Sequence, residues 1–310
     1  METGNTDSPL PEARVGAGSQ VAALFGAMRP RQWVKNLFVV APAIFAGTLF
    51  DRPSIFRVGV AFVVFCLVSS SVYLVNDVLD READRLHPSK CNRAIASGRL
   101  SVGIALAVAV IVGLAGLALG EILGPRFLMV VAIYIVITLA YSLYFKHAVI
   151  LDVMLLAAGF VLRVEAGAVA VSVPASEWLL LCTLLLALFL GFSKRRHELT
   201  LLEDGAANHR RVLVHYSAEL LDQMIVIVAT SAILCYILYT VWPSTVEKFH
   251  TNHLIFTVPF VIYCIFRYFY LIHQRQSGGD PTDTLLTDRP LLAGIVLWAV
   301  TAVAVVYSGR

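Results

Sequence analysis

Uninterrupted runs of apolar residues constrain the fold of this 310-residue chain more than any other feature. The run Ile225–Val241 and the one that follows Trp178 contain no charged residue, and about 20 such residues form a helix that crosses roughly 30 Å of hydrocarbon. Charged residues make up only 15% of the chain and hydrophobic residues 58%, whereas soluble proteins carry about 25% charged residues. The chain is therefore predicted to be an all-α integral membrane protein.

Nine segments have the length and composition of a membrane-spanning helix. They predict one domain, residues 21–310, in which nine transmembrane helices surround a central cavity. Residues 1–20 are rich in Gly, Ser, Pro and acids, which predicts a disordered tail. The nine segments are residues 31–50, 56–79, 101–119, 126–145, 149–171, 177–198, 219–241, 253–273 and 287–307.

Lys and Arg are distributed unevenly between alternate connections. The basic residues concentrate in the N-terminal segment and in the longer connections, and cytoplasmic loops are the ones that carry such an excess. We therefore predict a multi-pass protein of the plasma membrane, with a cytoplasmic N-terminus and a cavity open to the cytosol. The few basic residues on the other side are Arg52, Arg57, Arg126, Lys248 and Arg310.

An acidic sequence, NDVLDREAD at residues 76–84, ends the second apolar segment. At about 100° per residue, Asp77, Asp80 and Asp84 share one helix face with Tyr73. Carboxylates on one face repel one another, and each costs up to about 3 kcal/mol at a helix centre in a membrane. A divalent cation removes both penalties, and oxygen ligands beside a phosphorylated substrate favour Mg²⁺. The predicted metal ligands are these three carboxylates and Asn76.

Basic residues follow the acidic segment. Pro88 stops the helix after His87, and Lys90 and Arg93 lie in a loop that returns toward the same end of the bundle. Cationic groups beside a metal suit the remaining oxygens of a diphosphate. The preference of cytoplasmic loops for Lys and Arg is the alternative explanation for both residues.

This combination of the acidic segment, His87-Pro88, Lys90 and nine spans resembles the UbiA superfamily of polyprenyl transferases, over residues 25–308. The resemblance implies a helical bundle in which the acidic helix end binds a diphosphate through Mg²⁺. It also implies that Asp77, Asp80, Asp84 and Lys90 form the catalytic set.

The chain departs from the common superfamily pattern after its sixth apolar segment. Typical members that use prenyl diphosphates carry a second acidic motif there, D-x-x-x-D, whereas this chain has GFSKRRHE at residues 191–198. A basic run thus replaces the second acidic pair. The site is therefore expected to hold one metal and a more anionic substrate.

Ionisable residues near or inside the middle spans are further candidates, because such residues are costly in a membrane. Tyr141, Lys146 and Asp152 bracket the turn between the fourth and fifth spans, and Arg163 shares a helix face with Asp152 two residues before Glu165. All five are predicted to bind substrate. An internal ion pair of Arg163 that locks the bundle is the alternative.

Two segments, RQWVKN at residues 31–36 and the GFSKRRHE run, resemble the branch of the superfamily that transfers 5-phosphoribose. That resemblance implies transfer from phosphoribosyl pyrophosphate to decaprenyl (polyprenyl) phosphate, with release of diphosphate, for a cell-wall arabinan precursor. In this hypothesis the basic run binds the 5-phosphate or the lipid phosphate, and Glu165 and Glu198 bind ribose hydroxyls. The further substrate-binding candidates are Lys35, Asn36, Tyr73, Asn76, Arg93, Lys194, Arg195, Arg196 and His197.

Two other functions are compatible with the spans. A prenyltransferase would move a polyprenyl chain from its diphosphate to an aromatic acceptor, but the missing second acidic motif disfavours it. A transporter would line a path across the bilayer with its charges, whereas here nearly all candidate charges lie on one side. The expected partners are the lipid bilayer and the two substrates, without nucleic acid; a homo-oligomer is compatible with the sequence.

Overall fold

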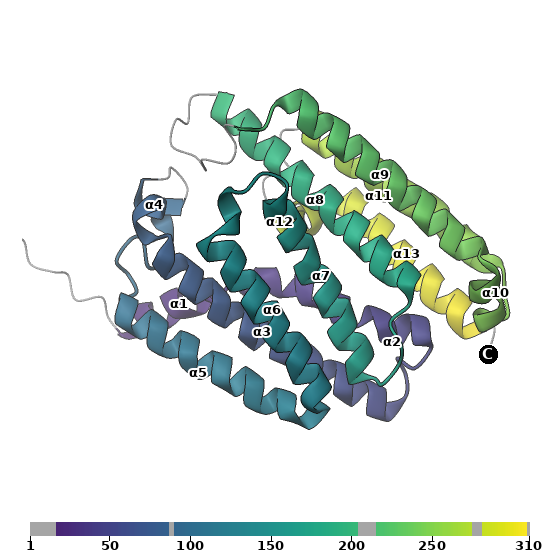
Figure 1. The fold of residues 1–310 in the computed structure, drawn as a ribbon, viewed down its shortest axis with the longest axis horizontal. Coiled ribbons are helices and arrows are strands. Elements are labelled where there is room, and N and C mark those ends of the chain that lie inside the picture. Colours follow the sequence, from purple (N-terminus) through teal and green to yellow (C-terminus); the bar gives the residue numbers. More distant parts are fainter. Residues whose placement is uncertain (1–16, 87–89, 204–214, 275–280, 309–310) are drawn as a thin grey trace, which may run out of the picture.

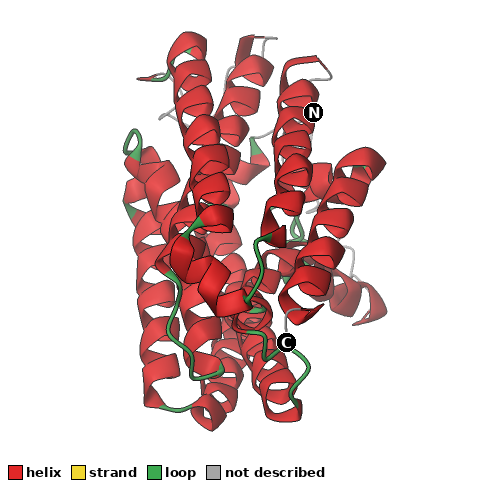
Figure 2. Ribbon diagram, turned by 90° about the vertical axis from the view of Figure 1, so that its right-hand side faces the viewer, coloured by secondary structure: helices red, strands yellow, loops and turns green. Residues whose placement is uncertain are grey.

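The computed structural model describes residues 17–86, 90–203, 215–274 and 281–308. Every regular element within these ranges is a helix, and Figure 2 shows the helices joined by loops. The predicted all-α class is therefore confirmed. Residues 1–16 of the predicted tail, and His87 and Pro88, lie outside the described residues.

Among the described residues, eight helices are long and apolar enough to cross a membrane. Their length and their scarcity of charged residues are typical of membrane spans. They agree closely with the last eight predicted segments. These helices are α3 (Arg52–Leu79), α5 (Val102–Gly120), α6 (Pro125–Leu143), α7 (Leu151–Ala170), α8 (Glu177–Glu203), α9 (Ala218–Val241), α11 (Val258–Gln274) and α13 (Arg289–Ser308).

Shorter helical pieces flank and connect the long helices. Local sequence sets several boundaries: the Ser101 hydroxyl accepts a hydrogen bond from Ile104 N at the start of α5, at 3.3 Å, and the Ser217 hydroxyl caps α9 in the same way through Leu220 N, at 3.1 Å. The shorter pieces are α1 (Ala17–Ala27), α2 (Ala41–Ala46), α4 (Arg81–Arg85), α10 (Pro243–Phe249), α12 (Pro281–Thr287), η1 (Pro30–Val39), η2 (Lys90–Asn92), η3 (Glu121–Leu123), η4 (Phe145–His147) and η6 (His253–Thr257).

The predicted first span, residues 31–50, is not one continuous helix. It consists of the 3₁₀ helix η1 and the short helix α2, and Arg29 turns the chain before it with φ 55°. Pro30 and Pro42 cannot donate backbone hydrogen bonds, which favours a break near each of them. The described chain therefore has eight continuous long helices where nine were predicted.

The broken segment is held against α3 and α7 by its side chains. Trp33 Nε1 donates to Ser70 Oγ at 3.0 Å, and Asn36 Nδ2 donates to Cys66 Sγ at 3.4 Å, so η1 runs antiparallel to α3. On its other side, η1 lies so close to α7 that a Cβ atom at Gly167 would overlap the backbone carbonyl oxygen of Val39. Tertiary contacts thus replace the regular hydrogen bonds of a continuous span.

The long helices lie side by side in the order α5, α3, α6, α7, α8 and α9, as Figure 1 shows. The first and last parts of the chain also meet, because Leu49 N donates to the Tyr307 hydroxyl at 2.8 Å and Thr282 Oγ1 to Gln32 Oε1 at 3.2 Å. This up-and-down order brings the C-terminal ends of α3, α6 and α8 together with the N-terminal ends of α7, α9 and α13. We call this the polar end of the bundle, since the ion pairs described below lie there.

Candidate active site

The acidic segment lies at the polar end, where α3 passes into α4. Asp80 N donates to Asn76 O at 2.9 Å, and Asp84 N donates to Asp80 O at 2.8 Å, so helical hydrogen bonding continues across the junction. Asp77 and Asp84 are buried, each 4% exposed, whereas the Asp80 side chain is 34% exposed. The predicted common face of the three carboxylates is thus formed by a nearly continuous helix.

Three cationic side chains neutralise these carboxylates. Arg93 Nη1 bridges two of them, at 2.7 Å from Asp84 Oδ2 and 3.2 Å from Asp77 Oδ1. Arg29 also pairs with Asp77, and Lys146 Nζ lies 2.5 Å from Asp80 Oδ1. The spacing of the carboxylates predicted that a metal relieves their repulsion; in this structure neighbouring cations relieve it.

The oxygen atoms at this end suit a divalent cation. Asn76 Oδ1 is buried and has no hydrogen-bond donor among the described residues, and it lies on the same helix end as the three carboxylates. No group of three His, Cys, Asp or Glu side chains in the described part of the chain forms a complete metal site by itself. That arrangement is compatible with Mg²⁺, which takes one or two carboxylates and fills its other positions with water and phosphate oxygens.

A hollow of about 370 Å³ opens beside Asp77. Arg29, Arg93 and Arg99 border it together with small residues of α1, and the Arg29 guanidinium lies over the Tyr73 ring, 4.9 Å from its centroid. A space bordered by three guanidinium groups suits phosphate oxygens. Lys90, predicted to act here, lies in η2, three residues before Arg93.

The residues of the basic run after the sixth predicted span differ in how deeply they are buried. Arg195 is only 1% exposed, and its Nε donates to Asp152 Oδ2 at 2.6 Å. Its two other nitrogens contact Glu198 Oε2 at 2.5 Å and the Tyr141 hydroxyl at 3.3 Å. The structure therefore places Arg195 in an internal ion-pair network that also holds Asp152, Tyr141 and Glu198.

Its neighbours on α8 are placed differently. Arg196 is partly exposed and pairs with Asp222 of α9, with 2.9 Å between Nε and Oδ1. Lys194 is half-buried, and His197 is buried at 8% exposed. Lys194 and Arg196 are therefore the two cations of the run that remain partly accessible to an anionic ligand.

Arg163 belongs to a separate buried network in the middle of the bundle. Its nitrogens donate to Asn36 Oδ1 at 2.9 Å, the Tyr134 hydroxyl at 2.9 Å and Gly159 O at 2.8 Å. The alternative was an internal ion pair of Arg163 with an acidic residue; Asp152, which shares its helix face, pairs with Arg195 instead. Arg163 and Asn36 instead join η1 to α7 through buried atoms. The two remaining candidates are close to this pair in the sequence: Lys35 precedes Asn36 on η1, and the half-buried Glu165 follows Arg163 by two residues on α7.

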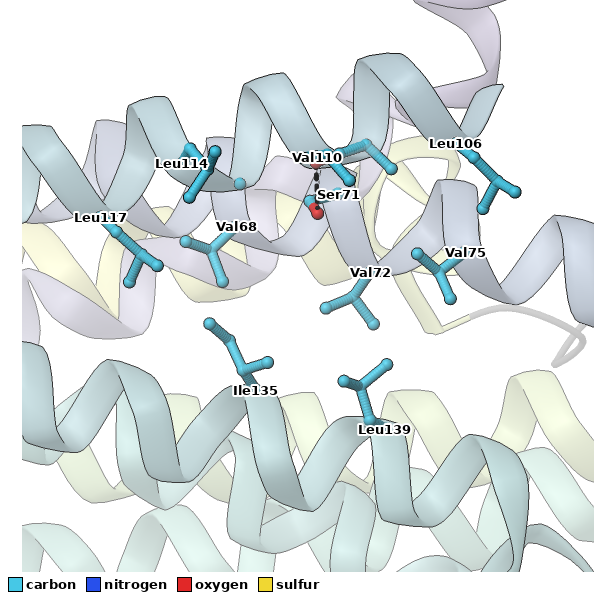
Figure 3. Close-up of a pocket in the computed structure, with 12 residues that line it drawn as sticks. Val68, Ser71, Val72, Val75, Leu106, Val110, Leu114, Leu117, Ile135 and Leu139 are labelled. Carbon is cyan, nitrogen blue, oxygen red and sulfur yellow. Dashed lines mark hydrogen bonds between the residues drawn. The ribbon is translucent and has the colours of Figure 1, made fainter. Parts of the chain in front are cut away.

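An apolar groove of about 250 Å³ runs along α3 away from the charged cluster. Figure 3 shows Val68, Val72 and Val75 of α3 facing Ile135 and Leu139 of α6 across it, with α5 forming the third wall. None of the residues that line it is charged. The groove therefore suits hydrocarbon, whereas the three carboxylates and their cationic partners lie at the polar end of the bundle.

Sequence reasoning missed several charged residues at the polar end, among them Asp222, the partner of Arg196. Arg29 and Arg99 lie in or near segments that are rich in basic residues, so nothing in the sequence distinguished them. Arg267 Nη2 and Asp288 Oδ2 form an ion pair at 2.8 Å between α11 and the start of α13. The signal for that pair was present, because Arg267 lies within the predicted eighth span, where an ionisable residue is costly.

The bundle and its charged helix end define a membrane-embedded protein of the UbiA class. Residues 36–286 match the model of the UbiA prenyltransferase family, and the chain belongs to that family. The structure of a UbiA homolog from Archaeoglobus fulgidus bound to GPP and Mg²⁺ has the same fold, with a TM-score of 0.70 at 16% identity, over 92% of this chain and 99% of that one.

Two relatives are more similar in sequence. The chain is 36% identical to the decaprenyl-phosphate phosphoribosyltransferase of Mycolicibacterium smegmatis, over 96% of this chain and 97% of the relative. It is 37% identical to the decaprenyl-phosphate phosphoribosyltransferase of Corynebacterium glutamicum, over 91% of this chain and 86% of the relative. The superfamily predicted from the acidic segment is thus confirmed.

Proposed function

We propose that this protein transfers 5-phosphoribose from phosphoribosyl pyrophosphate to decaprenyl phosphate and releases diphosphate. The observation that carries the proposal is the charge pattern of the polar end: one acidic cluster at Asp77, with cations in place of a second acidic cluster after the sixth predicted span. The relatives with 36% and 37% identity bear the name of this activity. The product would serve synthesis of a cell-wall arabinan precursor.

The acidic cluster is the proposed binding site for the leaving diphosphate. Mg²⁺ would be held here by Asp77, Asp80, Asn76 and Asp84. The Archaeoglobus homolog also binds Mg²⁺. When bound, Mg²⁺ acts as a Lewis acid that neutralises charge on the leaving group. Arg29 and Arg93 are placed to move from the carboxylates to diphosphate oxygens.

The reaction breaks the bond between C1 of ribose and the diphosphate oxygen, and it forms a bond between C1 and an oxygen of the lipid phosphate. The lipid phosphate is already anionic near neutral pH, because the second pKa of a phosphate monoester is about 6. The protein therefore needs to orient the acceptor and does not need a strong general base. Lys194 and Arg196 are the proposed contacts for the acceptor phosphate or the 5-phosphate, and Lys90 assists at the diphosphate.

We place the polar end at the cytosolic face of the plasma membrane, with a cytoplasmic N-terminus. The excess of Lys and Arg at this end supports that orientation. A water-soluble donor would reach the site from the cytosol, and the lipid acceptor from the bilayer. The central cavity open to the cytosol stays a prediction from the sequence, and so does a homo-oligomer.

The test of the proposed function is a comparison of substrate pairs with purified protein in Mg²⁺. We expect transfer with labelled phosphoribosyl pyrophosphate and polyprenyl phosphate, and none with a prenyl diphosphate and an aromatic acceptor. The reverse result would contradict the phosphoribosyl donor and support the prenyltransferase alternative, while membership of the family would stand.

A second prediction concerns the accessible cations of α8. Replacing Lys194 or Arg196 with Gln should raise the KM for phosphoribosyl pyrophosphate or for polyprenyl phosphate, by about tenfold for at least one variant, which is the scale of one lost charge-assisted hydrogen bond. Steady-state kinetics with each substrate varied in turn would show which phosphate is bound. Wild-type KM values for both variants would leave these residues as ordinary cytoplasmic-side cations.

A further inference from the structure

The turn between α6 and α7 has a strained backbone. Ile150 has φ 69° and ψ −48°, and Leu151 N donates to Val149 O at 2.8 Å, which closes a three-residue γ-turn. A β-branched residue with positive φ is a steric outlier, and such strain persists only where surrounding contacts hold it. The contacts around Ile150 therefore require an explanation.

Tyr216, just before α9, supplies those contacts. Its hydroxyl accepts a hydrogen bond from Ile150 N at 2.6 Å and donates one to Asp152 Oδ1 at 3.0 Å. The side chain is buried at 5% exposed, and burial raises the pKa of Tyr216 to about 12. The hydroxyl therefore keeps its proton at neutral pH and can donate to the carboxylate.

The strained turn connects the two charged clusters of the polar end. Before the turn, Lys146 contacts Asp80 of the acidic segment; after it, Asp152 pairs with Arg195 of α8. Lys146 and Asp152, which make these two contacts, are close together in the sequence, with Ile150 between them. A change of backbone conformation at Ile150 would therefore shift Lys146 relative to the acidic segment, because Asp152 is fixed by its buried partner.

We propose that Tyr216 is a positioning residue: its hydroxyl holds the strained turn at Ile150 and thereby fixes Lys146 against Asp80. The proposal rests on the proposed function, since the acidic segment gives the turn its role in the reaction. Tyr216 acts through the backbone at Ile150 and through Asp152, without touching the reacting atoms. Relieving the strain at Ile150 should therefore reduce the need for the hydroxyl.

The experiment combines two substitutions. Y216F should lower kcat/KM for phosphoribosyl pyrophosphate by about tenfold, the scale of a lost hydrogen bond to a charged group. Adding I150G should restore most of that loss, because glycine adopts positive φ without strain. The matched control is Y144F, which removes the hydroxyl of an exposed tyrosine at the same turn, 73% exposed, and should behave as wild type.

Hydrogen exchange of a peptide covering residues 146–152 provides a readout that does not depend on turnover. We expect faster exchange in Y216F, and if Y216F does not accumulate as folded protein, the double variant with I150G should. Wild-type kcat/KM in Y216F, or a loss that I150G fails to restore, would overturn the positioning role. Absence of transfer by the wild-type protein would instead contradict the proposed function, while unchanged exchange in Y216F would contradict the link between the hydroxyl and the turn.

Discussion

Replacement of Asp77 or Asp80 by Ala is expected to lower turnover by about three orders of magnitude, while the protein remains folded. A metal ion contributes several kcal/mol to stabilising the charge of a leaving group, and each 1.36 kcal/mol changes the rate by about tenfold. The fold should tolerate the changes because the cations left behind keep another partner or reach solvent. Arg93 still pairs with Asp84, and the side chains of Arg29 and Lys146 are 27% and 17% exposed.

Transfer of labelled phosphoribose, measured beside the thermal stability of the purified variants, is the appropriate assay. The matched control is D51A, which removes an exposed carboxylate from the opposite end of α3 and should leave turnover unchanged. EDTA should inhibit the wild-type enzyme, and excess Mg²⁺ should restore it. Near-normal turnover of both D77A and D80A in Mg²⁺ would refute the metal-binding role of the acidic segment.

Substitution of Arg195 should have its main effect on stability. Arg195 and Asp152 are both fully buried and paired at 2.6 Å, and removing one partner of a buried ion pair leaves an uncompensated charge, at a cost of about 3–5 kcal/mol. R195M should therefore yield less folded protein and a lower melting temperature. The measurements are the monodisperse fraction in detergent and the thermal unfolding midpoint.

The neighbouring R196Q variant is the matched control for this effect. Its partner Asp222 is 37% exposed, and exposed ion pairs contribute only about 0–1 kcal/mol. Stability close to wild type is therefore expected for R196Q, even if its KM for a substrate rises. An R195M protein with wild-type stability and a raised KM alone would return Arg195 to the role of substrate ligand that the sequence suggested.

Much of the fold was predictable from the sequence, because each membrane span must satisfy its backbone hydrogen bonds within its own helix. The apolar runs therefore located α3, α5, α6, α7, α8, α9, α11 and α13 to within a few residues. The exception was the segment at residues 31–50. Its apolar composition suggested a span, but Pro42 interrupts the helical hydrogen bonding. Trp33 and Asn36 also hold the segment against α3, and these contacts exist only in the folded bundle.

The sequence alone also determined the acidic helix end, because Asn76, Asp77, Asp80 and Asp84 are spaced by the helical repeat, which depends only on local geometry. Which cation meets which carboxylate was decided by the tertiary structure. Arg195 and Arg196 are adjacent in the sequence, yet Arg195 points into the bundle toward Asp152 while Arg196 remains partly exposed. Burial and long-range pairing depend on how α7, α8 and α9 pack together, and a charge pattern along one helix cannot encode that packing.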